Sequence, residues 1–350
     1  MSDGDTNRPP TTPEEPPQRL RFSVFVPTLK RPQLLRRNLE ALAVQSRVPD
    51  EILVSLRPDL DPEGVAVVEQ FIAANPKLRV VPVLLDTPGI VVAENALLDA
   101  ATGDVACFLD DDAIARPFWL ENLARHYERD RGVGGVAGPA IDVVDGRPRE
   151  RRARFRNRIL WPGLVNDQST RHSDRVVRSD HFRGANMSLR IPPLRAHGGF
   201  ETRLLGDCFR FELDACMGVA RQGYRLLFDP EAEADHHEAP RAHNTQRLAP
   251  DTVHNNAANE TFVFLKFYGP VGQLAHMLFA FTVGNFLNPG LAWGVAGSLL
   301  RPFWNNRYLL GVGAIGPAWK GRLRGWRMWR TWRRDGGRDG HVLPAAEAGR

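Results

Sequence analysis

The chain of 350 residues is 43% hydrophobic and 25% charged, a globular composition that excludes a wholly disordered or fibrous protein. Its three cysteines, Cys107, Cys208 and Cys216, exclude a disulfide-built scaffold, match no zinc motif and are typical of a reducing compartment. The formal net charge is +5, but residues 320–334 hold seven cations and no acid, so the rest of the chain is left with −2, which argues against nucleic acid as a partner.

The first 19 residues contain five prolines, four acidic residues and no apolar run. This composition predicts a disordered tail. A secretory signal would need a basic start and an apolar stretch, so we expect a protein that stays in the cytoplasm.

From residue 20 onward, strand and helix patterns alternate. Short apolar, β-rich runs predict strands at residues 22–26, 51–56, 78–85 and 105–109, and helical spacing of apolar residues predicts helices at 33–44, 65–75 and 91–101. Pro82 interrupts the third strand and places it nearer a sheet edge. The alternation predicts an α/β fold with a parallel sheet covered by helices on both faces. Ligands bind beyond the carboxyl ends of such strands, so we expect the chemistry in the loops after Val26, Leu56 and Leu109.

Beyond residue 115 the pattern is mixed. We expect a strand at 133–144, an irregular polar loop at 151–178, a helix at 209–222 and a strand at 224–228. The predicted organisation is one domain over residues 20–245, a helical, apolar and basic region over 246–335, and a disordered tail over 336–350.

The segment from residue 267 to 300 contains no charged residue and is long enough to span a bilayer. Prolines and polar residues interrupt it, so we expect two amphipathic segments that lie in or dip into the membrane. The tryptophans and arginines that follow suit an interfacial helix on anionic lipid, so residues 267–334 are predicted to bind the inner face of the cell membrane. The alternative is a buried helical pair with a solvated basic tail, which periodicity alone does not distinguish.

Three consecutive acids, Asp110, Asp111 and Asp112, directly follow the apolar run at 105–109. Such a run is often only a solvated turn. At the end of a buried strand, however, crowded carboxylates repel one another and need a compensating cation. Hard oxygen ligands that leave coordination sites open favour Mg²⁺ or Mn²⁺ holding a diphosphate.

A second group of polar residues follows further along the chain. Glu212 and Asp214 lie among apolar residues of the predicted helix at 209–222, where a partly buried carboxylate can serve as a general base. Ordinary surface acids are the alternative. His236 or His237 could complete the shell of a metal, although a histidine pair in a loop is more often surface.

Several motifs occur in a specific order: VFVPTLKRP at 24–32, GIVVAEN at 89–95, ATGDVACFLDDD at 101–112, RGANMSLR at 183–190, HGGF at 197–200, FE at 211–212 and DPEA…H at 229–236. Together, over residues 20–240, they resemble the family-two glycosyltransferases of the GT-A fold. Residues 253–261 and the apolar, basic tail resemble a bacterial, membrane-associated branch of that family.

The resemblance implies a GT-A nucleotide-binding sheet, mixed or parallel and sandwiched by helices, with a C-terminal helical membrane-associated extension. It also implies inverting transfer of a sugar from a nucleotide-sugar to a glycan or lipid-linked acceptor. It implies that Mn²⁺ or Mg²⁺ assists at Asp112 and His236, and that Glu212, with Asp214 nearby, provides the general base. The nucleotide-sugar would contact Pro27, Thr28, Arg31, Arg57, Asn95, Asp110 and Asp111, and the sugar and acceptor pocket would involve Arg183, Gly184 and Asn186.

Three positions depart from the family pattern. Arg57 replaces an acid that reads the nucleobase, Glu94 stands where an arginine is common, and Glu212 is a single acid where a pair is usual. These departures permit an alternative, a catalytically inactive scaffold that binds nucleotide-sugar or glycan at a membrane. A nucleotidyltransferase ranks below both because no Gly-rich phosphate loop with a basic residue occurs near the N-terminus.

Overall fold

The computed structural model describes residues 19–149, 157–166, 173–237, 249–300, 303 and 310–337. Most of the tails expected at residues 1–19 and 336–350, and parts of the loop expected at 151–178, lie outside these residues.

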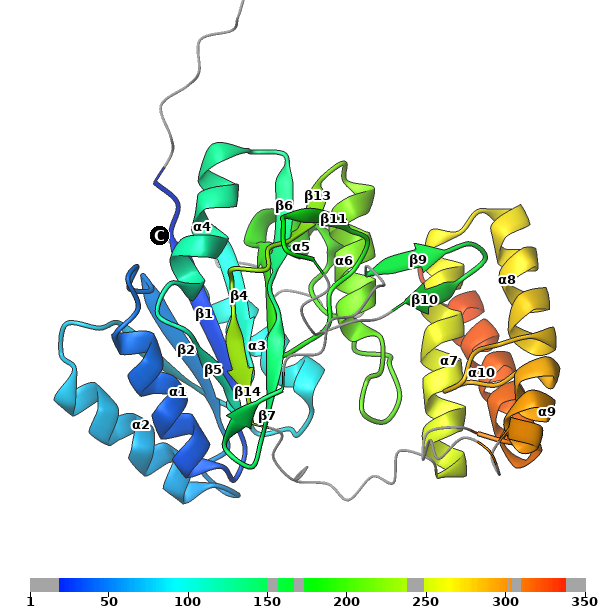
Figure 1. Cartoon of the computed structure of the whole chain (residues 1–350), viewed down its shortest axis with the longest axis horizontal. Helices are drawn as coiled ribbons and strands as arrows, with labels where there is room; N and C mark the ends of the chain where they lie inside the picture. The colour runs from blue at the N-terminus through cyan, green and yellow to red at the C-terminus, as the bar shows by residue number, and fades with distance from the viewer. Residues whose placement is uncertain are drawn as a thin grey trace, which may run out of the picture.

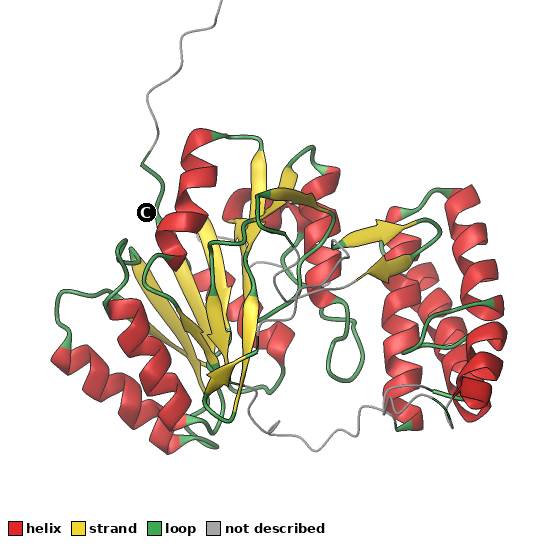
Figure 2. Cartoon of the chain, viewed as in Figure 1, coloured by secondary structure: helices red, strands yellow, loops and turns green. Residues whose placement is uncertain are grey.

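An eight-stranded mixed sheet forms the centre of the molecule, in the order β11-β13-β6-β12-β4-β1-β2-β3 (Figures 1 and 2). Its strands are β1 (Phe22–Pro27), β2 (Glu51–Leu56), β3 (Val80–Leu84), β4 (Val105–Leu109), β6 (Val133–Ala137), β11 (Val177–Ser179), β12 (Asn186–Arg190) and β13 (Arg225–Phe228).

The first half of the sheet follows the predicted alternation. Strands β1 to β4 pair in parallel and are connected by α1 (Pro32–Ala43), α2 (Pro62–Ala74) and α3 (Ile90–Ala100). The α/β prediction is confirmed, and β3, which contains Pro82, is the edge strand as expected. The carboxyl ends of β1, β2 and β4 therefore meet at one edge.

Two hydrophobic cores explain why β4 is apolar throughout. Val105, Cys107 and Leu109 face the core shared with α1, α2 and α4 (Trp119–Arg129). The intervening Ala106 and Phe108 face the core shared with α3, α5 (Ile191–His197) and α6 (Phe211–Arg221). Because successive side chains of a strand point to opposite faces, a strand covered on both sides must be apolar at every position.

The second half of the sheet contains the antiparallel pairing and corrects one prediction. Strand β12 runs antiparallel between β4 and β6, so the whole sheet is mixed, one of the two arrangements expected, although the strand alternation alone indicated a parallel sheet. The single strand expected at 133–144 is two strands, because Gly138 and Pro139 separate β6 from β7 (Ala140–Val144). A Cβ on Gly138 would lie 1.7 Å from the carbonyl oxygen of Ala232, so only glycine permits this approach.

After this break, β7 joins a small second sheet instead of the central one. The order is β5 (Ala113–Ala115), β14 (Ala234–His236), β7 and β8 (Arg147–Pro148). Since β5 directly follows the acid triplet and pairs with β14, this sheet carries His236 to the same edge as Asp112.

The C-terminal part is a helical module beside the α6 end of the sheet (Figure 1). It contains α7 (Pro250–Phe267), α8 (Pro270–Thr282), α9 (Leu291–Leu300), the 3₁₀ turn η1 (Val312–Ala314) and α10 (Ile315–Arg334), with the hairpin β9 (Arg158–Leu160) and β10 (Leu164–Asn166) next to it. Helices α7 and α10 cross closely at Gly321 and Gly325 of α10. A Cβ on either glycine would lie 2.2 Å from a backbone carbonyl oxygen of α7.

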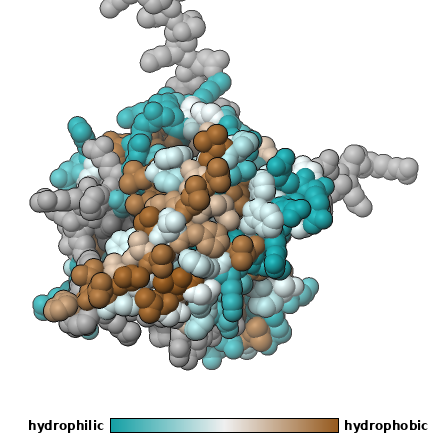
Figure 3. All heavy atoms as spheres, turned by 90° about the vertical axis from the view of Figure 1, so that its right-hand side faces the viewer, coloured by the Kyte–Doolittle hydropathy of each residue, from teal (hydrophilic) through white to brown (hydrophobic). Residues whose placement is uncertain are grey.

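The module exposes large apolar side chains on its outer side (Figure 3). We call the following set the apolar face: Val271, Leu274 and Leu278 of α8 with Leu291, Val295 and Leu299 of α9. Their spacing places them on one side of each helix. Within the described part of the chain, no helix combines the length and the apolar character that crossing a membrane requires.

Candidate active site

The acid triplet lies at the carboxyl edge of the sheet and is not a solvated turn. Asp111 and Asp112 are 3% and 5% exposed. Arg31, from the loop after β1, donates from Nη1 to Asp111 Oδ1 at 2.8 Å and to Asp112 Oδ2 at 3.1 Å. Thr28 Oγ1 donates to Asp111 Oδ2 at 2.8 Å. Arg31 is thus a cation that compensates the crowded carboxylates.

Asp110, the first residue of the triplet, has a perturbed pKa. Burial, followed by the charges of Asp112 and Asp111, raises the pKa of Asp110 to about 7. Asn38 holds the turn in place, since its Nδ2 donates to the carbonyl oxygens of Asp110 at 3.1 Å and Ala113 at 2.7 Å. The fixed turn therefore concentrates negative charge, which favours a bound cation.

His236 faces the third member of the triplet. Its Nε2 lies 3.5 Å from Asp112 Oδ1 and its Nδ1 lies 3.3 Å from Asp142 Oδ1. His237 turns away and places Nε2 3.2 Å from Arg37 Nη2. Burial, then the charge of Arg37, lowers the pKa of His237.

The donor set fits a divalent cation with few protein ligands. A carboxylate and an imidazole face each other at Asp112 and His236, but no group of three or more His, Cys, Asp or Glu side chains arranged to hold a metal occurs among the described residues. Mg²⁺ in particular keeps waters and substrate phosphates in its shell, so two protein ligands are compatible with such a site.

Glu212 lies in the first turn of α6. The backbone N–H of Gly184 donates to its Oε1 at 3.0 Å, and the amino end of a helix favours a carboxylate. Since Asn186 pairs with Leu109, directly before the triplet, Gly184 and the glutamate that it contacts lie at the same edge of the sheet as the triplet. The charge of Glu212 also raises the pKa of Asp110. Buried Glu94 of α3 joins them: burial, then the charges of Asp110 and Glu212, raises its pKa well above the ordinary value.

Asp214, expected beside Glu212 in catalysis, does not join this site. Its side chain is fully buried, with Oδ1 2.8 Å from Lys266 Nζ and Oδ2 3.0 Å from His197 Nε2. Burial would raise the pKa of Asp214, but Lys266 and His197 outweigh it and hold the pKa below its ordinary value. An ionised carboxylate held between two basic groups is not available to a substrate.

Two asparagines expected in ligand binding have structural contacts instead. The Asn95 amide accepts from the backbone N–H of Phe200 at 2.8 Å and donates to its carbonyl oxygen at 2.8 Å. Asn186 is 2% exposed, accepts from Trp119 Nε1 at 2.8 Å and donates to two backbone carbonyl oxygens. Both amides therefore fix the backbone beneath the cleft.

Arg57 and Arg183, both expected at the site, differ in their contacts and exposure. Arg57, at the carboxyl end of β2, donates through Nε and Nη2 to Asp59 at 3.0 and 2.7 Å, so its guanidinium is held by its own loop. Arg183 is exposed next to Gly184, and Pro27 is partly exposed at the end of β1. These two positions remain predictions for ligand contact.

The sequence analysis missed Asn38 and Asp142. Asn38 had a signal, because it stands on the apolar stripe of the helix at 33–44 with Leu35, Leu39 and Leu42. Asp142 had none, since its place beside His236 depends on the pairing of β7 with β14.

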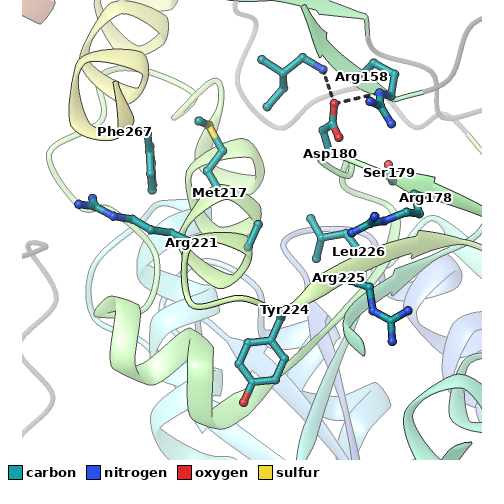
Figure 4. A pocket seen from close by; sticks show the side chains of 12 residues that line it. Arg158, Arg178, Ser179, Asp180, Met217, Arg221, Tyr224, Arg225, Leu226 and Phe267 are labelled. Carbon is teal, nitrogen blue, oxygen red and sulfur yellow. Dashed lines mark hydrogen bonds and ion pairs between the residues drawn. The ribbon is translucent and has the colours of Figure 1, made fainter. Parts of the chain in front are cut away.

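A cavity of about 650 Å³ lies elsewhere (Figure 4). It is lined by Tyr224 and Arg225 at the amino end of β13, and by Asp180, which accepts from Arg158 Nε at 3.1 Å and from the backbone N–H of Ile159 at 2.9 Å. Since β13 runs parallel to β6, this cavity lies at the sheet edge opposite the acid triplet. It plays no part in the site.

Comparison with known proteins agrees with this geometry. Residues 23–190 match the family described as glycosyl transferase family 2. A glucosyl-dolichyl phosphate glucuronosyltransferase of Haloferax volcanii is 27% identical over 154 residues, which are 42% of this chain and 47% of the relative. The succinoglycan biosynthesis protein ExoM of Rhizobium meliloti is 32% identical over 126 residues, 35% of this chain and 40% of the relative. The match thus spans less than half of either relative.

Solved structures show the same fold. The mannosyltransferase PcManGT from Pyrobaculum calidifontis, in complex with GDP-Man and Mn²⁺, aligns with a TM-score of 0.54 at 16% identity, covering 91% of this chain and 84% of that one. GalNAc-T7 with UDP, GalNAc and Mn²⁺ aligns with a TM-score of 0.51 at 15% identity, covering 81% of this chain and 57% of that one.

Proposed function

Because the chain belongs to glycosyl transferase family 2 through residues 23–190, we propose that it transfers a sugar from a nucleotide-sugar to a hydroxyl group of a cell-envelope, lipid-linked or polysaccharide glycan. The observation that carries this proposal is that the acid triplet and Glu212 lie at one edge of the sheet. Asn186 pairs with Leu109, directly before the triplet, and Gly184, two residues before Asn186, donates to Glu212. An acid cluster for the donor diphosphate and a carboxylate for the acceptor are the two components such a transfer needs.

On the donor side, Arg31 and Thr28 hold Asp111 and keep the loop after β1 against the triplet. Asp112 and His236 would hold the divalent cation, Mn²⁺ or Mg²⁺. When bound, that cation neutralises negative charge on the diphosphate as it leaves.

On the acceptor side, Glu212 takes the proton from the attacking hydroxyl group. The acceptor oxygen forms a bond to the anomeric carbon from the face opposite the diphosphate, the bond from that carbon to the diphosphate oxygen breaks, and the configuration inverts. A single base is sufficient, unlike the two carboxylates of retaining hydrolases. The Gly184 N–H orients the carboxylate.

The helical module supports the proposal that the protein works at the inner, cytoplasmic face of a membrane. Its apolar face is exposed, with Val271 at 79%. Lys320, Arg324, Arg327 and Arg330 of α10 are exposed as well. Apolar side chains next to cations fit a lipid surface with anionic headgroups, where a lipid-linked acceptor would be found.

Substitution of Glu212 tests the assigned base. Glu212→Gln keeps the shape of the side chain and its contact with Gly184, so binding of the donor should not change, while transfer should fall by about 100-fold or more. Release of nucleoside diphosphate would be measured with UDP-, GDP- and dTDP-sugars, with Mn²⁺ and with a chelator in its place. Glu121→Gln is the matched control, because Glu121 also occupies the first turn of a helix, α4, but contacts Ser46.

The same assay separates the enzyme from the inactive scaffold. Normal turnover by Glu212→Gln would show that another group is the base. No release from any donor by the unmodified protein, with donor still bound, would favour the scaffold. Equal activity with Mn²⁺ and with chelator would contradict the role of Asp112 and His236.

A further inference from the structure

We propose that Glu260 and Lys266, both from α7 of the helical module, are positioning residues that hold the first turn of α6 and thereby keep Glu212 in its place beside Gly184. The inference rests on the proposed function for its kinetic consequence. Its structural content, that α7 orders this turn, is independent of the reaction.

The first of these contacts is made by Arg210, two residues before Glu212. Arg210 ends the loop before α6 in a left-handed conformation, with φ of 79°. Its guanidinium donates to Glu260 Oε2 from Nη2 at 2.9 Å and from Nε at 3.3 Å. The side chains of Arg210 and Glu260 are only 8% and 2% exposed, so water does not screen the pair. The ion pair therefore fixes the point at which α6 begins.

Glu260 is itself held by the rest of the module. Its Oε1 accepts from Asn285 Nδ2 at 3.0 Å, and Arg322 Nη1 of α10 lies 4.0 Å away. Arg322, in turn, donates from Nη2 to the carbonyl oxygen of Asn288 at 2.6 Å. Burial would raise the pKa of Glu260, but Arg210 and Arg322 outweigh it and keep the pKa below the ordinary value. Ionised Glu260 of α7 thus has polar contacts with α10, with the α8–α9 connection and with the residue that precedes α6.

The second contact is made by Asp214, two residues after Glu212. Lys266 Nζ lies 2.8 Å from Asp214 Oδ1 and 3.2 Å from Glu201 Oε2, and all three side chains are buried. Asp214 also binds His197 of α5. Since a helical turn contains about 3.6 residues, Arg210 and Asp214 bracket the turn that carries Glu212.

Stability alone does not explain two buried ion pairs at this place. Removing two charges from water costs about as much as their attraction returns, so apolar side chains would serve the packing equally well. A base, by contrast, must be held within a fraction of an ångström of its working position, since a displacement of about 1 Å can cost about 100-fold in rate. The contacts are placed where they restrict α6 most closely around Glu212.

Glu260→Gln tests the ion pair between Glu260 and Arg210. Glutamine keeps the shape of the side chain and its contact with Asn285 but removes the charge that holds Arg210. We expect kcat to fall by about tenfold while the KM and Kd of the donor change by less than about twofold. We also expect faster hydrogen exchange of the Phe211 and Asp214 amides, which donate to the carbonyl oxygens of Cys208 and Arg210.

The control removes the same charge from another buried glutamate that is paired with an arginine but lies on β2, outside α6 and the helical module. Glu51 of β2 is fully buried and accepts from Arg79, Ser23 and Thr102. Glu51→Gln should lower the Tm to a similar extent but leave kcat and the exchange of the α6 amides unchanged. A fall in kcat of equal size in both variants would mean that the effect is general destabilisation, and would overturn the proposal.

Lys266 provides the second pair of variants, useful if Glu260→Gln does not fold. Lys266→Met should lower kcat and expose the α6 amides, and Lys266→Arg, which keeps the charge, should restore both. Unchanged exchange and kcat in folded Glu260→Gln and Lys266→Met would refute the positioning role. If the unmodified protein transfers no sugar, the proposed function fails, and the exchange measurements still decide whether α7 orders this turn.

Discussion

Gly184 and Glu212 form the contact on which the orientation of the proposed base depends. The Gly184 N–H donates to Glu212 Oε1 at 3.0 Å, and a Cβ on residue 184 would lie 2.8 Å from the same oxygen. The φ of Gly184 is not positive, so alanine is compatible with the backbone. We expect Gly184→Ala to fold normally but to push the carboxylate aside and lower kcat by about tenfold.

This prediction is checked by measuring kcat and Tm on the same preparation. Gly316→Ala is the control, because nothing lies within 4 Å of the Cβ that it adds. Wild-type kcat in Gly184→Ala would mean that the Gly184 contact does not orient the base. A large loss of Tm would mean that backbone near residue 184 moves in place of the carboxylate.

At the scale of single elements, α8 is attached to the rest of the protein through a buried histidine. His276 donates from Nδ1 to the carbonyl oxygen of Pro162 at 2.9 Å, and its ring centroid lies 4.9 Å from that of Phe264. Burial lowers the pKa of His276 to about 4 from 6.5, against smaller effects of the Pro162 carbonyl and Glu260 that raise it. The folded protein therefore keeps this imidazole neutral.

The sign of the pH dependence follows from this lowered pKa. Between the folded pKa of about 4 and the unfolded value of 6.5, the unfolded chain binds a proton that the folded chain does not. The stability that the neutral His276 imidazole contributes is therefore present above pH 6.5 and is lost as the pH falls toward 4. From about pH 7 to about pH 5.5, the free energy of unfolding should fall by about 1 kcal/mol more in the wild type than in His276→Gln. Denaturant titrations at both pH values measure this, and equal losses in the two proteins would contradict it.

At the scale of the whole molecule, the proposed binding to a membrane depends on the apolar face. We expect the protein to sediment with vesicles containing anionic lipid, less so as salt is raised, because cations of α10 accompany the apolar side chains. Replacing both Val271 and Leu274 by Asp should reduce the bound fraction about tenfold without unfolding α8, since both side chains are exposed.

The control for vesicle binding is another exposed apolar position. Val44, after α1, is 73% exposed, close to the 79% of Val271, and lies outside the helical module. Val44→Asp should bind vesicles like the wild type. Equal loss in both variants, or no binding by the wild type, would contradict a lipid surface as the partner of the apolar face.

The amino-acid sequence by itself determined the half of the fold that contains β1 to β4. Apolar runs and helical spacing are local properties of the sequence. A strand that is apolar at every position, such as β4, is predicted to be buried on both faces. Because the acid triplet follows β4 without a gap, its place at the carboxyl edge of the sheet was predictable too.

Only the tertiary structure decided which acids lie together at the candidate site. Glu212 and Asp214 are two residues apart on α6, which turns about 100° per residue, so their side chains point in nearly opposite directions. One carboxylate reaches Gly184, and the other is buried against Lys266 of the helical module. Likewise, His236 meets Asp112 because β14 pairs with β5, and Asn95 meets Phe200 because α3 packs beside the segment after α5. These contacts join residues distant in the chain, and a local sequence pattern carries no information about which distant partner a side chain will meet.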